Sequence, residues 1–149
     1  MRACTCGEQQ VRKYQQRISG PMLDRFDIQL DVQRVDFDKL TDNRRGERSD
    51  AIRARVEAAR ERQQQRHQQF PGVLTNSDLG ASEIDQVCIL TDSATQLLKA
   101  AMRKLQLSAR AYHRVLKVSR TIADLSASET IQVEHVAEAI QYRSRNLLM

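Results

Sequence analysis

Arg110 stands where its charge is hard to explain unless an anion is nearby. Ser108 is a candidate N-cap, which places Arg110 in the first turn of the helix that follows. The positive end of the helix dipole disfavours a cation there by roughly 0.3–1 kcal/mol. Backbone amides at a helix start and a guanidinium group both suit phosphate, so a bound phosphate would remove the conflict. The alternative is an exposed arginine that is tolerated at this small cost.

Arg25 is the second arginine with a distinctive context. It lies between Asp24 and Asp27, in the segment that enters a predicted strand. An ion pair with one of these two carboxylates is its simplest role. The spacing alone therefore predicts a local structural contact.

Cys4 and Cys6 could supply half of a zinc site. Structural zinc takes four Cys or His ligands, usually in pairs two to four residues apart. These two cysteines are separated by one residue and have no second pair nearby. A metal would need ligands from another chain or from sequence that is not present, so we expect none in this chain alone. Cys88 falls at an apolar helix position and is predicted to pack as a small hydrophobe.

The other residues form no complete catalytic constellation. The sequence has no GxxxxGK[ST] phosphate loop, no strand ending in paired carboxylates and no HExxH. The histidines are isolated from one another, which predicts surface or boundary positions for all three: His67, His113 and His135.

Composition limits the class of protein. The chain has 149 residues, 24 basic and 19 acidic, with 40% hydrophobic and only 4% aromatic residues. That is enough for one lean core of aliphatic side chains. No apolar stretch approaches the roughly 20 residues that span a bilayer. Three cysteines do not make a disulfide scaffold. These features predict a reduced, cytoplasmic protein that makes no use of a membrane.

The second half of the chain is predicted to be all-α. All five glycines and both prolines lie at or before position 80, so residues 81–149 contain no helix breaker. Ser82, Thr91 and Ser108 are candidate N-caps for successive helices, and a last helix is expected from Glu134. Apolar residues at helical spacing predict the buried faces: Ile84 and Val87; Ala94, Leu97, Leu98, Ala101, Met102 and Leu105; Ala111, Tyr112, Val115, Val118, Ile122 and Leu125; Val136, Ala137, Ile140 and Leu147.

The first half is less self-sufficient. A short polar helix is expected over 9–17, and alternating apolar residues predict a strand over 26–32. No second convincing strand exists, so the strand must pair with another chain or with a sheet outside this sequence. Residues 49–70 predict a long polar helix that leans lightly on the bundle through Ile52, Val56 and Ala59.

Two long motifs in the chain resemble the magnesium-chelatase-like AAA+ ATPases, and within them the bacterial competence proteins of the ComM/YifB type. The first is ISGPMLDRFDI over 18–28, and the second is LSARAYHRVLKV over 107–118. Residues 121–125 and 131–143 continue the match, whereas the stretch between 35 and 107 matches more loosely. The resemblance implies that residues 1–34 are the last piece of an αβα nucleotide-binding core. It assigns 35–80 to a linker and the long helix, and 81–149 to a helical lid.

The resemblance also implies roles for the two arginines. Arg25 would be an arginine finger that reaches the ATP of a neighbouring subunit, and Arg110 the second sensor, which contacts the terminal phosphate within its own subunit. Cys4 and Cys6 match the second half of a four-cysteine insertion found in some members. ATP and Mg²⁺ would be held by an upstream core in a homo-oligomeric, six-membered ring. The parent would translocate or branch-migrate DNA, whereas this chain alone would hold no cofactor and hydrolyse no ATP.

Two other functions remain open from the residues. The charge of +5, the Arg-rich helix over 49–70 and a ridge of Arg114, Lys117 and Arg120 would suit a basic helical module that binds nucleic acid. Against it, residues 1–70 intersperse 11 acidic among 15 basic side chains, which predicts only weak, salt-sensitive attraction. The third possibility is a structural module whose arm, residues 1–34, docks on another chain.

Overall fold

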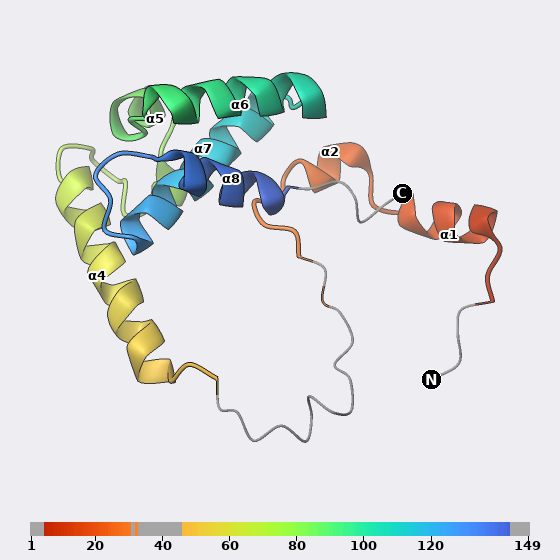
Figure 1. The fold of residues 1–149 in the computed structure, drawn as a ribbon, viewed down its shortest axis with the longest axis horizontal. Coiled ribbons are helices and arrows are strands. Elements are labelled where there is room, and N and C mark those ends of the chain that lie inside the picture. The colour runs from red at the N-terminus through yellow and green to blue at the C-terminus, as the bar shows by residue number, and fades with distance from the viewer. Residues whose placement is uncertain (1–4, 31, 33–45, 144–149) are drawn as a thin grey trace.

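The structure is a computed structural model that describes residues 5–30, 32 and 46–143. Within this part the chain forms seven α-helices, one 3₁₀-helix and no sheet (Figure 1). The helices are α1 (Glu8–Gln15), α2 (Gly20–Leu23), α4 (Ser49–His67), η1 (Asn76–Asp78), α5 (Ala81–Val87), α6 (Asp92–Leu105), α7 (Ala109–Leu125) and α8 (Val133–Gln141). The predicted all-α class is confirmed. No helix in the described ranges has the length and apolar character that crossing a bilayer requires.

Side-chain caps start the two longest bundle helices. The Thr91 hydroxyl accepts a hydrogen bond from the Ala94 N–H at 3.3 Å, and the Ser108 hydroxyl accepts one from the Ala111 N–H at 3.2 Å. Both caps were expected from the sequence. The predicted cap at Ser82 is wrong, because α5 begins one residue before it with Gly80 in the extended N-cap position.

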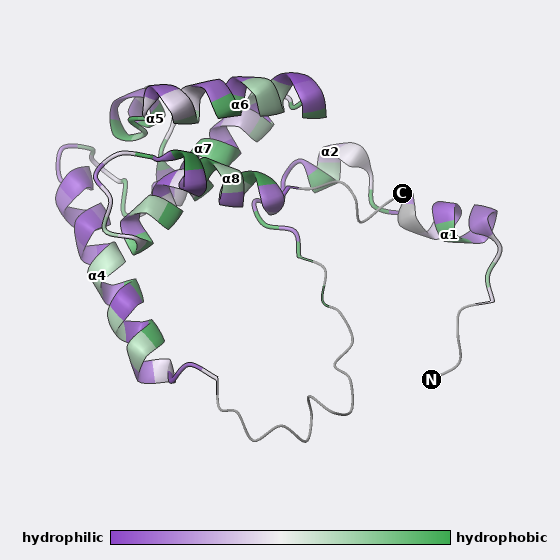
Figure 2. Cartoon of the chain, viewed as in Figure 1, coloured by the Kyte–Doolittle hydropathy of each residue, from purple (hydrophilic) through white to green (hydrophobic). Residues whose placement is uncertain are grey.

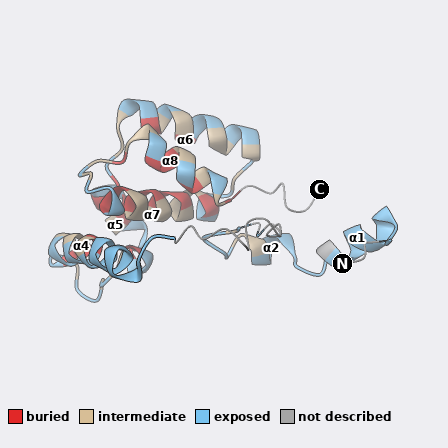
Figure 3. Cartoon of the chain, turned by 60° about the horizontal axis from the view of Figure 1, so that its bottom comes forward, coloured by how far each residue is buried: buried red, intermediate tan, exposed pale blue. Residues whose placement is uncertain are grey.

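The core lies around α7, which contacts α4, α5, η1 and α8. Figure 3 shows the buried residues concentrated in α7 and neighbouring elements, whereas α1 and most of α4 are exposed. The side chains are small aliphatics, as the composition predicted: Leu79, Ile84, Val87, Ala94, Leu98, Val115, Leu116, Ala123, Ile131, Val136 and Ala139. Leu125 was expected inside but is 38% exposed. Leu147 lies outside the described residues.

A parallel β-bridge between Leu90 and Ile131 joins the loop before α6 to the loop before α8. The Ile131 N–H donates to Ile89 O at 2.8 Å, and the Thr91 N–H donates to Ile131 O at 3.1 Å. Because Ile131 is fully buried, these bonds satisfy backbone groups that water cannot reach. The bridge therefore fixes where α6 and α8 start relative to each other.

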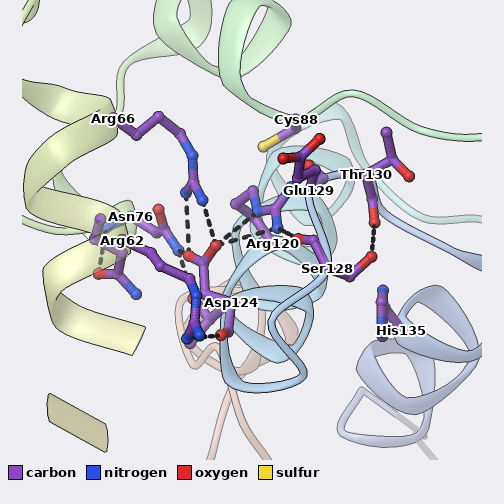
Figure 4. Close-up of polar contacts among 12 residues, drawn as sticks. Arg62, Arg66, Asn76, Cys88, Arg120, Asp124, Ser128, Glu129, Thr130 and His135 are labelled. Atoms are coloured by element: carbon purple, nitrogen blue, oxygen red, sulfur yellow. Dashed lines mark hydrogen bonds and ion pairs between the residues drawn. The ribbon is translucent and has the colours of Figure 1, made fainter. Parts of the chain in front are cut away.

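A buried carboxylate, that of Asp124, joins α4 to α7. Arg66 on α4 donates to both of its oxygens, at 2.5 and 3.1 Å. Arg120, one turn earlier on α7, donates to it at 3.1 Å, and the Asn76 amide donates at 2.8 Å (Figure 4). Asp124 is fully buried, so this fan of donors is what makes its charge tolerable in the core.

Arg120 is also fully buried, which corrects its predicted place on a surface ridge. Its guanidinium donates to the carbonyl oxygens of Ser128 and Glu129, at 2.5 and 2.7 Å, in addition to Asp124. Burial lowers the pKa of Arg120, and the nearby Asp124 charge opposes that shift. We predicted an exposed position for Arg120 because a charged residue is rarely buried without partners.

The long helix α4 is anchored at one end only. It is predominantly hydrophilic along its length (Figure 2). Ala59, Gln63 and His67 are buried against the bundle, but Ile52 and Val56 are 40% and 43% exposed. The N-terminal half of α4 extends away from the other helices (Figure 1). Of the expected apolar stripe, only Ala59 is therefore buried. The ion pair between Arg66 and Asp124 is a further contact that attaches α4 to α7.

The prediction of surface or boundary positions is wrong for two histidines. His67 and His135 are 2% and 4% exposed. His135 has a clear role, because its Nδ1 accepts the Gln132 N–H at 3.0 Å and caps α8. His67 has no hydrogen-bond partner on either ring nitrogen among the described residues. Burial, and then the charge of Arg66, lower the pKa of His67.

The predicted strand over 26–32 does not form within the described residues. Residues 26–30 run as an extended segment after α2, and its apolar side chains Phe26, Ile28 and Leu30 are 47%, 54% and 66% exposed. A strand exists only through its ladder partner, and the described part of the chain offers none.

Removing the charge of Asp124 should strongly destabilise the bundle. We expect Asp124→Asn to lower the free energy of unfolding by about 3 kcal/mol, because it leaves Arg120 buried without its counter-ion. Urea denaturation of the purified chain measures this. Asp85→Asn, on an exposed side chain of α5, is the matched control and should change stability by less than about 0.5 kcal/mol. A loss below about 1 kcal/mol for Asp124→Asn would contradict the role of the pair.

Stability should fall as the pH drops from 7 to 5. The unfolded state takes up a proton on His67 near pH 6.5, whereas the native state, with its lowered pKa, takes it up only at lower pH. The unfolded state thus binds more protons in that window and is favoured. Thermal unfolding at a series of pH values should show a smaller drop for His67→Leu than for wild type. His113→Gln, the control, should keep the wild-type dependence.

Candidate functional site

A cavity of about 630 Å³ lies beside the N-terminal half of α7. The cavity is lined by residues of α7, by Leu79 and Ile84 from the η1–α5 region, and by Asp27 of the N-terminal arm. Two other cavities in the described residues are smaller, at about 270 and 240 Å³. Elements far apart in the sequence therefore meet at one concave surface.

Four basic or titratable side chains from α7 line this cavity: Arg110, His113, Arg114 and Lys117. Their spacing of three, one and three residues places all four on one face of the helix. The sequence showed the same spacing, but only the neighbouring walls make it a concave basic site.

The cations of this face differ in their partners. Arg114 Nη1 lies 2.5 Å from Asp27 Oδ1, and Lys117 Nζ donates to Ser77 O at 2.8 Å. Arg110 is exposed to the cavity, and it has no hydrogen bond or ion pair within the described ranges. Its charge is thus the one on this face that neither a carboxylate nor a carbonyl group compensates there.

The start of α7 adds donors to the same place. The Ser108 hydroxyl caps the Ala111 N–H, while the earliest amides of an α-helix have no intrahelical acceptor. Arg110 sits in this first turn, where its charge opposes the helix dipole. The start of α7 therefore combines two groups that suit a phosphate, the free backbone amides of the first turn and the guanidinium of Arg110, which is unpaired within the described residues.

Arg25 lies apart from the cavity, on the exposed arm just after α2. Among the described residues its guanidinium makes one hydrogen bond, a long one of 3.5 Å from Nη1 to Pro21 O. The expected pairing with Asp24 or Asp27 is wrong: Asp27 pairs with Arg114, and Asp24 faces Arg143 at 3.7 Å. The guanidinium of Arg25 is left pointing to solvent rather than neutralised by its neighbours.

Metal binding finds no support in the described residues. No group of three or more His, Cys, Asp or Glu side chains lies close enough together there to hold an ion. Cys6 is exposed, and Cys4 lies outside the described residues. Cys88 is buried in the core as predicted, and burial raises the pKa of its thiol to about 11.

Comparison with known proteins places this arrangement in a family. The profile of the magnesium chelatase subunit ChlI C-terminal region matches residues 46–143, and that of magnesium chelatase subunit ChlI matches residues 1–40. The chain belongs to the ChlI family. The resemblance inferred from the two long motifs is thereby confirmed, and both motif arginines lie inside matched segments.

Bacterial relatives extend the match to nearly the whole chain. It is 43% identical to competence protein ComM of Haemophilus influenzae over 137 residues, which is 91% of this chain and 26% of ComM. It is 39% identical to the uncharacterized protein YifB of Escherichia coli over 145 residues, 97% of this chain and 28% of YifB. The YifB protein of Salmonella typhimurium is 37% identical over 145 residues, again 97% and 28%. This ChlI-type chain thus spans about a quarter of the length of these relatives.

The contact between Asp27 and Arg114 is the part of the site that sequence reasoning missed. The two residues are 87 positions apart, and Asp27 has an arginine, Arg25, only two positions away. Only their membership of the two matched motifs could have suggested that they meet. Arg120, by contrast, carried a usable signal, because its spacing of four from Asp124 permits an ion pair within one helix.

Proposed function

We propose that this ChlI-type chain is the helical lid and arginine-finger region of an AAA+ ATPase. In this role it couples ATP binding and hydrolysis to the remodelling of another molecule. The observation that carries the proposal is Arg110: an uncompensated guanidinium at a helix start, in the lining of a basic cavity. Such a group is suited to an anion that another part of the enzyme delivers.

Arg110 acts as the second sensor. It contacts the terminal phosphate of ATP bound in its own subunit, together with the amides that start α7. The cavity supports this role because Lys117, whose partner there is the carbonyl oxygen of Ser77, adds a positive charge on the same face as Arg110. Loss of that phosphate on hydrolysis removes the partner of Arg110 and changes the preferred position of the lid.

Arg25 acts as the arginine finger, in trans. A finger must reach another subunit, so it has to be exposed and without a competing carboxylate. Arg25 meets both conditions, since Asp24 and Asp27 face other side chains. Its guanidinium stabilises the charge that develops on the phosphoryl group transferred in the neighbouring subunit.

The partners follow from these two roles. An upstream nucleotide-binding core holds ATP and Mg²⁺, and a homo-oligomeric ring of six subunits brings Arg25 to the next ATP. The exposed apolar residues Phe26, Ile28 and Leu30 complete the sheet of that core, where a strand partner would cover them. The resemblance to the competence proteins of the ComM/YifB type supports DNA as the remodelled molecule, translocated or branch-migrated during natural transformation.

Binding of nucleic acid without ATPase function is the second candidate, and the charge pairing disfavours it. Arg120 is buried and Arg114 is paired with Asp27. On α4, Arg55 pairs with Glu47 and Arg66 with Asp124. The positive charge left for phosphates is therefore small, and attraction to DNA should be weak and salt-sensitive.

The chain alone should release no phosphate from ATP above the buffer background. It contributes the sensor and the finger but not the phosphate loop or the carboxylates that hold Mg²⁺. A malachite-green assay on the purified chain measures this. ATP hydrolysis that persists after repeated purification would contradict the assignment of the phosphate loop and the Mg²⁺ ligands to another part of the enzyme.

In the complete ATPase, each arginine should be indispensable. We expect Arg25→Ala to lower kcat by about three powers of ten, as loss of a finger does elsewhere. Arg110→Ala should weaken both ATP binding and turnover. Arg12→Ala on the arm and Arg103→Ala on α6, both exposed, are the matched controls. Mixed rings separate the roles, because the defect of Arg25→Ala should appear in the neighbouring subunit. Unchanged turnover in Arg25→Ala rings would refute the finger assignment.

A further inference from the structure

Residues 24–30, the segment that carries Arg25, are held by polar contacts to the lid rather than by a hydrophobic core. Its apolar side chains are about half exposed or more, so burial of hydrophobic surface contributes little to its position. Figure 1 shows it passing close to the end of α8. The few polar contacts it makes there decide where it lies.

The best-formed of these contacts links Asp27 to Arg114, with Nη1 and Oδ1 2.5 Å apart. The side chains of Arg114 and Asp27 are 27% and 51% exposed, so water reaches this ion pair from the Asp27 side. Arg114 lies one helical turn after Arg110, on the same face of α7. The residue that anchors the Arg25 segment and the residue that faces the cavity thus belong to one rigid element.

Further contacts, at Asp24 before Arg25 and at Phe26 and Gln29 after it, also come from the lid. The Ser108 hydroxyl, the N-cap of α7, lies 3.4 Å from Asp24 Oδ2. Arg143, just after α8, lies 3.5 Å from Asp24 O and 3.4 Å from Phe26 O. The Gln29 N–H donates to Tyr142 O at 2.8 Å. The segment is therefore fixed on both sides of Arg25, and each anchor is in α7 or at the end of α8.

We propose that Arg114 is a positioning residue that ties the Arg25 segment to α7. The position of the lid is then coupled to the placement of Arg25, so that the phosphate contacted by Arg110 in one subunit biases where Arg25 lies relative to the next. This inference rests on the proposed function. It adds the physical link between the two arginines, namely the Asp27–Arg114 pair with Asp24 held beside it.

The physical reason is that Arg25 itself has no carboxylate partner in the described residues, while both carboxylates beside it are engaged. Pairing Asp24 and Asp27 with the lid keeps them from neutralising Arg25. It also restricts the backbone on either side, so less ordering is needed when the guanidinium meets a phosphoryl group. Without these contacts the guanidinium of Arg25 would occupy many positions relative to the neighbouring subunit.

Amide exchange on the 149-residue chain tests the link directly, without ATP or a ring. We expect Arg114→Ala and Asp27→Ala to raise the exchange rate of the Gln29 amide by about two- to fivefold, the range of a partly exposed ion pair. The double variant Asp27→Arg with Arg114→Asp should restore protection. Arg103→Ala, which removes a cation from α6, is the control and should leave exchange unchanged. Equal exchange in wild type and both single variants would overturn the proposal.

Turnover in the assembled ring supplies the second measurement. Arg114→Ala should lower kcat about tenfold, within the usual range of coupling between sites, with the KM for ATP unchanged. The charge-swapped pair should recover it. If Arg25→Ala abolishes turnover while Arg114→Ala and Asp27→Ala match wild type, the link is wrong and the proposed function stands. If Arg25→Ala itself leaves turnover intact, the proposed function is wrong. The Asp27–Arg114 contact then positions no arginine finger.

Discussion

The buried carboxylate of Asp124 is the interaction on which the rest of this structure depends. It collects donors from α4, from η1 and from its own helix (Figure 4). A charge without water must have such partners, since the alternative is a desolvation penalty of several kcal/mol. The lean aliphatic core, with only 4% aromatic residues, contributes little directional specificity of its own. The network around Asp124 therefore fixes how α4 and α7 lie against each other.

That fixed helix, α7, organises the proposed function. Its first turns line the basic cavity, its last turns hold Asp124, and its middle packs against α8. One continuous helix carries both Arg110, which lines the cavity, and Arg114, which pairs with Asp27. Under the proposed function, a displacement at the cavity would therefore reach the Arg25 segment through a single helix.

Local chemistry could be predicted well and long-range pairing could not. The hydroxyl caps at Thr91 and Ser108 follow from the residues next to them, and both are present. The cap at Ser82 failed because Gly80, two positions earlier, adopts the extended conformation first. The predicted ridge containing Arg120 is wrong because charge was taken as a sign of exposure, whereas three oxygens, one each from Asp124, Ser128 and Glu129, accept its hydrogen bonds in the interior. The strand over 26–32 failed because its alternation needs a partner.

The sequence by itself determined the helical class, the starts of α6 and α7 and, through two long motifs, the family. Each of these depends on residues within a few positions of one another. Tertiary structure alone decided which charges meet. Arg66 finds Asp124 across 58 positions and Arg114 finds Asp27 across 87, although nearer carboxylates were available to both. The choice is made by the packing of α7 against α4 and the arm, because an ion pair depends on distance in space and not along the chain.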